Sequence, residues 1–400
     1  MSKIKKVDQE TLKNLNRQII LNYIRKYREI SRIDLSQYTR LSPTTVSAIT
    51  AELIGKKLIT EIRIGDSSGG RRPLMVGVNP DASYVITAIL NPKEITYTIV
   101  DLSCNMVEKE RISCDIDNPD TVKYVLQKSL GSILQKYLHN RDKICGIGVS
   151  IPGVIDHNNG KVLYSSKLHL KDFDIAAIIE SQTGIRSYLF KDSDALMLGE
   201  YNFGIASTYK NIVYINVEDG VGMSYINSGK LFLPGYGGGF ELGHITIDSN
   251  GSLCRCGNRG CLGTVVSERP VLNKLEKLLE KGYESDISIS KNINLKDIVE
   301  YSNNGDKAAR YVLEEQARLL GTAVASVINL FNPQLVVIGG PFSKCKWEFL
   351  SILRDTVRDR ALETYSRGVK IEYAKLQDDS ALIGMANDIF EKEIFKPIEL

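Results

Sequence analysis

The sequence predicts an α/β protein preceded by a small winged helix–turn–helix head. Residues 1–79 hold 15 Lys and Arg against 7 Asp and Glu, a net charge of +8. Residues 80–400 hold 36 Lys and Arg and 41 Asp and Glu, a net charge of −5. The pattern of apolar residues predicts helices and a basic hairpin in residues 1–79, and strands alternating with helices in residues 80–400. A basic head on a mildly acidic body is typical of a nucleic-acid module joined to a different domain.

Length and composition exclude several classes of protein. A chain of 400 residues exceeds the roughly 250–300 residues of a single core, so more than one domain is expected. No apolar run approaches the ~20 residues that span a bilayer, and the charged start MSKIKKVDQE lacks a secretory apolar segment. We therefore expect a cytoplasmic protein with no membrane partner. Seven irregularly spaced cysteines argue against a disulfide framework.

Three helices are predicted within the first 57 residues. Lys13–Tyr27 and Arg32–Tyr38 place apolar residues at helical spacing. Ser42 followed by Pro43 predicts the start of the third, because Ser caps the first turn and Pro needs no N–H there. Short hydroxyl side chains on this helix are suited to base edges and phosphates in a major groove. The candidate DNA-binding residues here are Ser42, Thr44, Thr45, Ser47 and Thr50.

A basic hairpin follows the three helices. Leu58–Ile64 and Leu74–Val78 are predicted strands, and the turn between them contains Arg71 and Arg72. These arginines complete the candidate DNA-binding set, since a wing can enter a minor groove or bind phosphates. A protein-interaction module of the same fold remains the alternative.

From residue 82 onward the chain alternates between strands and helices. The predicted strands are Tyr84–Leu90, Glu94–Asp101, Ile144–Ile151, Asn211–Asn216 and Leu335–Ile338, and Thr121–Leu138 is a predicted amphipathic helix. Glycines follow several of these strands, which is where α/β folds open onto ligands.

Four potential metal ligands lie within 18 residues. His244, Cys254, Cys256 and Cys261 offer one imidazole and three thiolates, a set that suits tetrahedral Zn²⁺. Four protein ligands leave no open coordination position, so the expected site is structural. A group of reduced, buried cysteines is the alternative. Cys104, Cys114, Cys145 and Cys345 lack such neighbours and are expected to be small core residues.

Together these residues resemble the ROK family of repressors, open reading frames and kinases. The resemblance rests on Glu241–His244 with the cysteine loop, on Gly148–Asp156 and on Asn329–Gly340, while the wing at 67–73 is similar to the xylose-repressor-like and N-acetylglucosamine-repressor-like branch. It implies a two-lobed actin-like, ribonuclease-H-like ATPase fold for the body. The expected domains are 1–79 for the head, 80–195 for lobe 1 with a returning helix at 380–400, and 196–379 for lobe 2 with the zinc loop and dimerisation helices.

Two loops depart from the kinases of this family. The resemblance implies an Asp-x-Gly phosphate loop where this chain has Ile89–Lys93, and a Gly-Thr-Gly run where it has Glu218-Asp219-Gly220. Two carboxylates facing a triphosphate would repel it, because even in water like charges 4 Å apart cost about 1 kcal/mol. No catalytic activity is therefore expected.

The sugar-binding positions implied by the resemblance are also altered. Asp192, Glu241 and His244 remain, whereas lysines stand at 167 and 191 and Gly263 replaces a glutamate. The candidate effector residues are Lys167, Lys191, Asp192, Glu241 and His244. Either the effector is an unusual, anionic sugar or the pocket is degenerate; equally, both lysines can pair with Glu218, Asp219 or other acids.

The predicted function is a sugar-responsive repressor of carbohydrate genes, such as those of xylose use. It is expected to bind palindromic operator DNA as a homodimer or a dimer of dimers, because paired heads meet half-sites one or more helical turns apart. Zn²⁺ is the expected cofactor and a sugar or sugar-derived molecule the expected effector. The alternatives are a ROK sugar kinase with an appended DNA-binding head and a regulator that docks on another protein.

Overall fold

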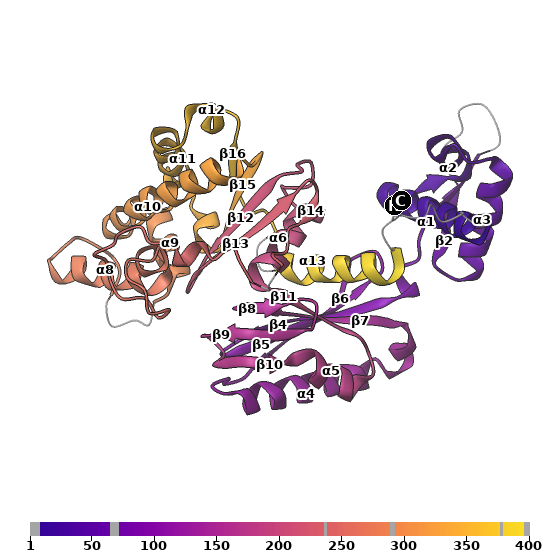
Figure 1. Cartoon of the computed structure of the whole chain (residues 1–400), viewed down its shortest axis with the longest axis horizontal. Coiled ribbons are helices and arrows are strands. Elements are labelled where there is room, and N and C mark those ends of the chain that lie inside the picture. The colour runs from indigo at the N-terminus through magenta and orange to yellow at the C-terminus, as the bar shows by residue number, and fades with distance from the viewer. Residues whose placement is uncertain (1–8, 65–71, 236–237, 289–292, 377–378, 396–400) are drawn as a thin grey trace, which may run out of the picture. The chain divides into compact units, whose positions relative to one another are not determined.

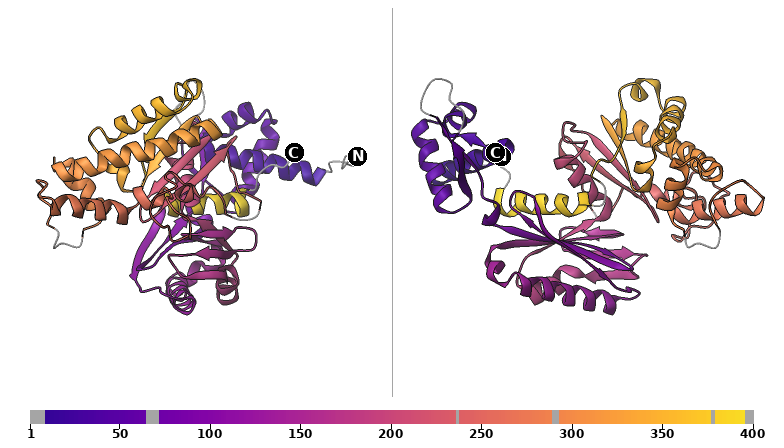
Figure 2. Two further views of the ribbon diagram at one scale, coloured as in Figure 1. Left: turned by 60° about the vertical axis from the view of Figure 1, so that its left-hand side comes forward. Right: turned by 180° about the vertical axis from the view of Figure 1, so that it is seen from behind.

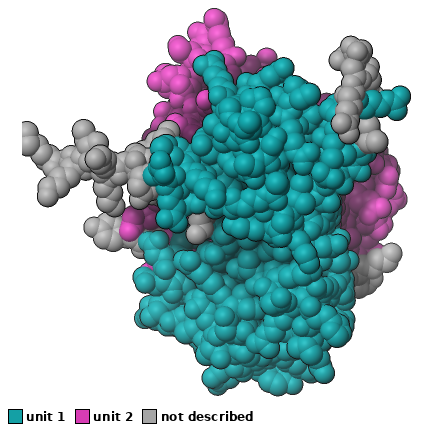
Figure 3. Space-filling model, turned by 90° about the vertical axis from the view of Figure 1, so that its right-hand side faces the viewer, with its two compact units in different colours: residues 1–152, 157–190, 385–400 teal, residues 153–156, 191–384 magenta. Residues whose placement is uncertain are grey.

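Two compact units make up the chain in the computed structural model, which describes residues 9–64, 72–235, 238–288, 293–376 and 379–395 (Figure 3). Unit 1 comprises residues 1–152, 157–190 and 385–400, so it includes the head. Unit 2 comprises residues 153–156 and 191–384. The division between the units falls after residue 190, where the sequence suggested 195, and after Gly384, where it suggested 379.

The head is a winged helix–turn–helix, as the sequence predicted. Its elements are α1 (Gln9–Tyr27), β1 (Ile30–Ser31), α2 (Arg32–Thr39), α3 (Pro43–Gly55), β2 (Ile59–Ile64) and β3 (Leu74–Val78) (Figure 1). The strands form a sheet in the order β1-β3-β2. Ile24, Leu35, Leu53 and Val76 are fully buried, so helices and wing share one core. The short strand β1 was not predicted, because two residues carry no alternating pattern.

A five-stranded sheet forms the body of unit 1. Its strands are β4 (Tyr84–Asn91), β5 (Glu94–Asp101), β6 (Met106–Ser113), β7 (Ile144–Ile151) and β11 (Ser187–Lys191), and a turn of 3₁₀ helix, η1 (Pro80–Ala82), precedes them. Helices α4 (Pro119–Lys136) and α5 (Ile175–Thr183) cover one face of this sheet (Figures 1 and 2). Two smaller elements, η2 (Leu138–Lys143) and the hairpin of β9 (Lys161–Ser165) and β10 (Leu170–Asp174), also belong to this unit.

Unit 2 contains a second five-stranded sheet. Its strands are β12 (Ile212–Val217), β13 (Val221–Asn227), β14 (Lys230–Leu231), β15 (Leu335–Gly339) and β16 (Lys370–Tyr373), and β8 (Val154–Asp156) also belongs to this unit. The helical elements are α6 (Asp192–Phe203), η3 (Leu242–His244), α7 (Gly263–Val266), α8 (Glu268–Glu280), α9 (Leu295–Asn303), α10 (Lys307–Phe331), η4 (Pro341–Lys344), α11 (Phe349–Arg360) and α12 (Glu363–Ser366).

Both sheets have the same topology. In unit 1 the order is β6-β5-β4-β7-β11, and in unit 2 it is β14-β13-β12-β15-β16. Each begins with an antiparallel meander whose first strand then pairs in parallel with a later one, β4 with β7 and β12 with β15. Two units of this kind make the body an actin-like, two-lobed fold.

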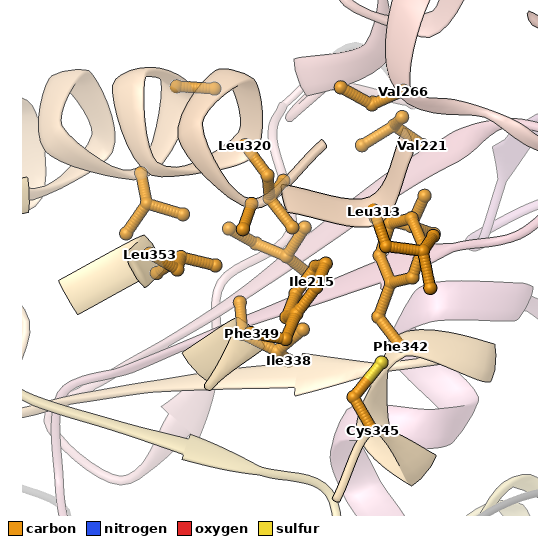
Figure 4. Close-up of a cluster of buried hydrophobic side chains, with 14 of the residues drawn as sticks. Ile215, Val221, Val266, Leu313, Leu320, Ile338, Phe342, Cys345, Phe349 and Leu353 are labelled. Atoms are coloured by element: carbon orange, nitrogen blue, oxygen red, sulfur yellow. The ribbon is translucent and has the colours of Figure 1, made fainter. Parts of the chain in front are cut away.

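Alternate residues of β12 bury against helices on opposite faces of the unit 2 sheet. Val213, Ile215 and Val217 belong to a large core that includes α10 and α11, whereas Ile212 and Tyr214 pack with Met197 of α6. Figure 4 shows part of the larger core, where Leu320 of α10 lies near Ile215 and Leu313 lies near Phe342. Burial on both faces explains why these strands are nearly continuous hydrophobic runs.

One helix begins in unit 2 and ends in unit 1. Helix α13 (Asp379–Phe390) crosses the division after Gly384 and continues into a π-helical turn, η5 (Glu391–Phe395). Its second half packs against β7, where the absence of side chains at Gly146 and Gly148 makes room for Ile389. Among the described residues, no helix has the length and apolar character needed to cross a bilayer.

Candidate DNA-binding surface, metal cluster and effector site

The start of α3 presents a cluster of hydroxyl groups to solvent. Ser42 is its N-cap, and Ser42 Oγ accepts a 3.1 Å hydrogen bond from Thr45 N–H. The same oxygen lies 2.8 Å from both Thr44 Oγ1 and Thr45 Oγ1. Ser42, Thr44 and Ser47 are exposed and Thr45 is half-buried. These four predicted residues therefore share an accessible surface at one end of the helix.

Thr50 does not belong to that surface. It is fully buried, and its hydroxyl donates to Val46 O at 2.9 Å. Arg32 Nε in turn donates to Thr50 Oγ1 at 3.0 Å, while the same guanidinium pairs with Glu61 of the wing at 3.1 Å. The assignment of Thr50 to DNA contact is therefore wrong. Helical spacing alone placed Thr50 at the edge of the polar face of α3, and the structure shows that side chains of α2 and β2 cover this edge.

The wing is formed by β2 and β3. Arg72 is exposed just before β3. Arg71, its predicted companion, lies outside the described residues. The register of β2 against β3 shifts between Glu61 and Arg63.

The structure brings the four predicted metal ligands together. The donor atoms of His244, Cys254, Cys256 and Cys261 all lie within 4.8 Å of one another. Cys254 Sγ is 3.6 Å from His244 Nδ1, and Cys256 Sγ is 3.7 Å from Cys261 Sγ. Tetrahedral Zn²⁺ with bonds of about 2.0–2.3 Å requires ligand atoms roughly 3.5–3.8 Å apart, so the geometry of this set suits that ion.

Backbone hydrogen bonds fold the cysteine loop around the cluster. Cys254 N–H donates to Asn258 O at 2.7 Å, and Ile247 N–H donates to Gly260 O at 2.9 Å. Gly260 has φ +65°, and a Cβ there would lie 1.5 Å from Asp248 O. Only glycine fits this approach, which explains its place one residue before Cys261.

The thiols of the cluster differ in acidity. Hydrogen bonding from the Asn258 backbone lowers the pKa of Cys256 below its ordinary value. Burial raises the pKa of Cys261 to about 12, and its hydrogen bond with Cys254 adds to that shift. Three adjacent thiols cannot all ionise without a cation, whereas a divalent metal binds them as thiolates.

Within the part of the chain that the structure describes, the remaining four cysteines belong to no such cluster. Cys345 is buried, and Cys104, Cys114 and Cys145 are partly buried. Burial raises the pKa of Cys104 and Cys345 to about 12 and that of Cys145 to about 11.

Lys191 forms an ion pair with another candidate effector residue. Its ammonium donates to Glu241 Oε1 at 2.8 Å and to Gly239 O at 3.0 Å, and only 8% of the side chain is exposed. The sequence left open whether Lys191 binds an anionic effector or pairs with an acidic side chain. The structure shows pairing with an acid, and that acid is Glu241, not Glu218 or Asp219. With Asp192 the three formal charges sum to −1, which does not favour an anionic ligand.

The other effector candidates lie in two different units. Asp192 starts α6 and lies near Gly222, since a Cβ at that glycine would be 3.8 Å from Asp192 Oδ1. Gly243, beside His244, approaches Val221 closely, because its Cβ would lie 2.7 Å from Val221 O. Asp192 and the backbone at Gly243, between Glu241 and His244 in sequence, therefore border the start of β13 in unit 2. Lys167 belongs to unit 1 and is half-buried.

A small, open pocket lies at the carboxyl ends of β12 and β15. It is lined by Leu196, Tyr214, Asn216, Glu218, Lys296, Gly340, Pro341, Ser343 and Lys344. The sequence analysis identified Glu218 and Gly340 here but missed both lysines, Lys296 of α9 and Lys344 of η4. Asp219 is not part of the lining. Because two lysines accompany the single carboxylate, the lining carries a net positive charge, and the expected repulsion of a triphosphate is weaker than two carboxylates would produce.

A winged helix–turn–helix joined to an actin-like body defines a class of transcriptional regulators. The ROK family model matches residues 92–392, and the chain belongs to this family. It is 28% identical over 373 residues to the DNA-binding transcriptional dual regulator NagC of Escherichia coli strain K12, covering 93% of this chain and 92% of that protein. It is 30% identical over 377 residues to the xylose repressor of Caldicellulosiruptor bescii, covering 93% of this chain and 94% of that protein.

A solved structure matches almost the whole chain. It is a ROK family transcriptional regulator, a homolog of the E. coli MLC protein, with a TM-score of 0.83 and 28% identity over 96% of this chain and 97% of that one. The family also includes kinases, whose structures share the fold of the body.

Proposed function

We propose that this chain is a sugar-responsive transcriptional repressor that binds operator DNA as a homodimer and does not phosphorylate its effector. The observation that carries the proposal is the head, where the exposed hydroxyls of Ser42, Thr44 and Ser47 lie at the start of α3 in a module of net charge +8. Hydroxyl groups at a helix start can contact phosphates and base edges, and the excess of Lys and Arg attracts the backbone. This function places the protein with the DNA, in the cytoplasm.

Selection from a random DNA library tests operator binding. The full-length protein should enrich an inverted repeat, and footprinting should protect two half-sites separated by one or more helical turns. A variant with Thr44 and Ser47 both changed to Ala should lose affinity for that sequence, and the matched control is a double change at Thr322 and Ser326, two hydroxyls on α10 of unit 2. Failure to enrich any sequence would contradict the proposal.

A neutral sugar is the proposed class of effector. The Lys191–Glu241 pair leaves the cluster of Lys191, Asp192 and Glu241 with a net negative charge, and carboxylates accept hydrogen bonds from sugar hydroxyls. Calorimetry against neutral pentoses and hexoses, sugar acids and sugar phosphates should show binding only among neutral compounds. Preferential binding of a sugar acid or phosphate would reject this class.

Zn²⁺ is the proposed structural ion of the cluster formed by His244, Cys254, Cys256 and Cys261. Support comes from the mutual distances of the donor atoms and from the closed set of four ligands. When bound, the ion would hold the loop beside Glu241, a candidate effector residue, in one conformation.

A kinase remains the second candidate because two lysines line the pocket at the ends of β12 and β15. Against it stands the turn between β4 and β5, where Pro92 and Lys93 occupy the place of the family's Asp-x-Gly loop. Incubation with ATP and the same sugar panel decides between them, because transfer of labelled phosphate to any sugar would establish the kinase. Capture of a specific protein only in the absence of operator DNA would instead support a docking regulator.

A further inference from the structure

Arg25, in the last turn of α1, joins the head to the C-terminal segment of the chain. Its Nη2 donates to Asn387 Oδ1, and its Nη1 pairs with the carboxylate of Glu391. The guanidinium also lies over the ring of Phe395, 4.2 Å from its centroid. Only 22% of the Arg25 side chain is exposed. The charged guanidinium of Arg25 thus donates two hydrogen bonds and makes one cation–π contact, all with residues more than 360 positions later in the sequence.

The partners of Arg25 belong to a firmly packed segment. Asn387 is 3% exposed, and its Oδ1 also accepts a 3.7 Å hydrogen bond from Cys104 Sγ. Ile389 fits against Gly146 and Gly148 of β7, where added Cβ atoms would lie 2.6 and 2.9 Å from it. Beyond the helix, the carboxylate of Glu393 accepts a hydrogen bond from the Tyr188 hydroxyl. Arg25 is therefore bound to a part of unit 1 that is itself anchored to the sheet.

The covalent connection between head and sheet is short. Only residues 79–83, including the single turn η1, separate β3 from β4. A single connection of this kind leaves rotation about its backbone bonds, whereas a second point of attachment removes it. The Arg25 contacts supply that second point.

We propose that Arg25 is a positioning residue: it fixes the orientation of the DNA-binding head on the end of α13, and thereby sets the half-site spacing that a dimer accepts. This inference rests on the proposed dimeric operator binding. Two heads held rigidly read half-sites at one separation, since each base pair added between them rotates one site by about 34° around the duplex. Heads released from α13 reach half-sites over a range of separations.

The helix that carries Asn387 also packs against the helix that starts at the candidate effector residues. Gly384 of α13 meets Gly199 of α6 so closely that a Cβ on Gly384 would lie 2.4 Å from Gly199 N. Ser380 Oγ donates to Leu196 O at 2.6 Å beside this contact. Helix α6 begins at Asp192, directly after Lys191, so it starts at two of the candidate effector residues. Helix α13 contacts α6 within unit 2 and carries Asn387, the partner of Arg25, within unit 1.

The test uses full-length protein and a series of operators. The two half-sites obtained by selection are kept constant, and their separation is changed one base pair at a time over a full helical turn. Wild type should prefer one separation by about tenfold or more, and Arg25→Ala should reduce this preference to about threefold or less while still binding a single half-site. Arg25→Lys should behave like Arg25→Ala, because an ammonium keeps the charge but not the planar fork. Glu391→Gln, which keeps the size of the partner, should give an intermediate profile.

Lys26→Ala is the matched control, since it removes one positive charge from the same turn without touching α13 and should keep the wild-type profile. Hydrogen exchange supplies an independent readout: amides of residues 387–395 should exchange faster in Arg25→Ala than in wild type and Lys26→Ala. An unchanged spacing profile in Arg25→Ala would overturn the proposal, as would a wild-type protein that binds DNA with no preferred separation. If wild type binds no DNA, the proposed function fails, and unchanged exchange in Arg25→Ala then overturns the attachment separately.

Discussion

Three thiols and one imidazole converge at the cysteine loop, although only His244 and Cys256 among them are exposed. Sequence spacing was sufficient to identify all four residues, because short loops limit how far apart their side chains can lie. Spacing did not reveal that Lys191 pairs with Glu241, since 50 residues separate the two along the chain. It also misplaced Thr50, whose burial depends on Arg32 and the wing.

Removal of one ligand should release the metal. Cys256→Ser is expected to lose about one Zn²⁺ per chain and to lower the free energy of unfolding by roughly 3 kcal/mol or more, because three remaining ligands hold the ion poorly. Operator affinity should fall as the loop loosens. Metal analysis by mass spectrometry and thermal denaturation measure these effects. Cys114→Ser, outside the cluster, should retain metal and stability; unchanged metal content in Cys256→Ser would refute the assignment.

Alkylation should distinguish the two kinds of cysteine. Burial raises the pKa of Cys345 to about 12, so about one thiol in 10⁴ is ionised at pH 8 and the nucleophilic thiolate is nearly absent. The lowered pKa of the exposed Cys256 increases the fraction of its nucleophilic thiolate. After treatment with a chelator, iodoacetamide should therefore modify Cys256 long before Cys345, as followed by peptide mass spectrometry. Comparable rates at both positions would contradict this order.

At the level of elements, local rules predicted the boundaries of the helices and strands that were named from the sequence, but many elements of the body, such as α5, β13 and β16, were not predicted. The cap at Ser42, Pro43 at the first helical position and Gly55 at the end correctly delimit α3. The predicted strands at 94–101 and 144–151 match β5 and β7. Strand β6 was missed, because its residues Met106–Ser113 alternate between exposed and half-buried positions at the edge of the sheet and include four charged side chains.

The N-cap of α3 can be tested separately from DNA contact. Ser42→Ala removes the acceptor for Thr45 N–H, a loss of about 1 kcal/mol, so exchange of that amide should accelerate about fivefold. Ser47→Ala removes an exposed hydroxyl from the same helix without touching the cap, and it should leave this rate unchanged. Amide exchange measured by NMR or mass spectrometry gives both values. Equal acceleration in the two variants would show that the cap is not the cause.

At the level of the whole molecule, charge is divided between a basic head and an acidic body. A neutral average, +3 in 400 residues, conceals this division. The proposed binding of DNA through the head would release counterions, and affinity should therefore fall steeply with salt even though the net charge is small.

The salt dependence of operator affinity should report on the wing. Arg72→Ala is expected to weaken binding to all sequences similarly and to reduce the slope of log affinity against log salt by about 1, the contribution of one phosphate contact. Lys123→Ala, an exposed change on α4 of the body, should leave the slope unaltered. Fluorescence anisotropy at several salt concentrations measures both. An unchanged slope in Arg72→Ala would exclude a phosphate contact by this side chain.

Sequence alone determined the features that depend on neighbouring residues: the capped helix, the alternating strands, the loop that brings three cysteines together and the charge division near residue 80. Tertiary structure decided what depends on residues far apart in the chain. The matching topology of the two sheets has no visible repeat in the sequence, because strand pairing constrains burial pattern and not residue identity. The Lys191–Glu241 pair, the burial of Thr50 and the attachment of Arg25 to Asn387 likewise arise only on folding, since each contact joins side chains that no local rule relates.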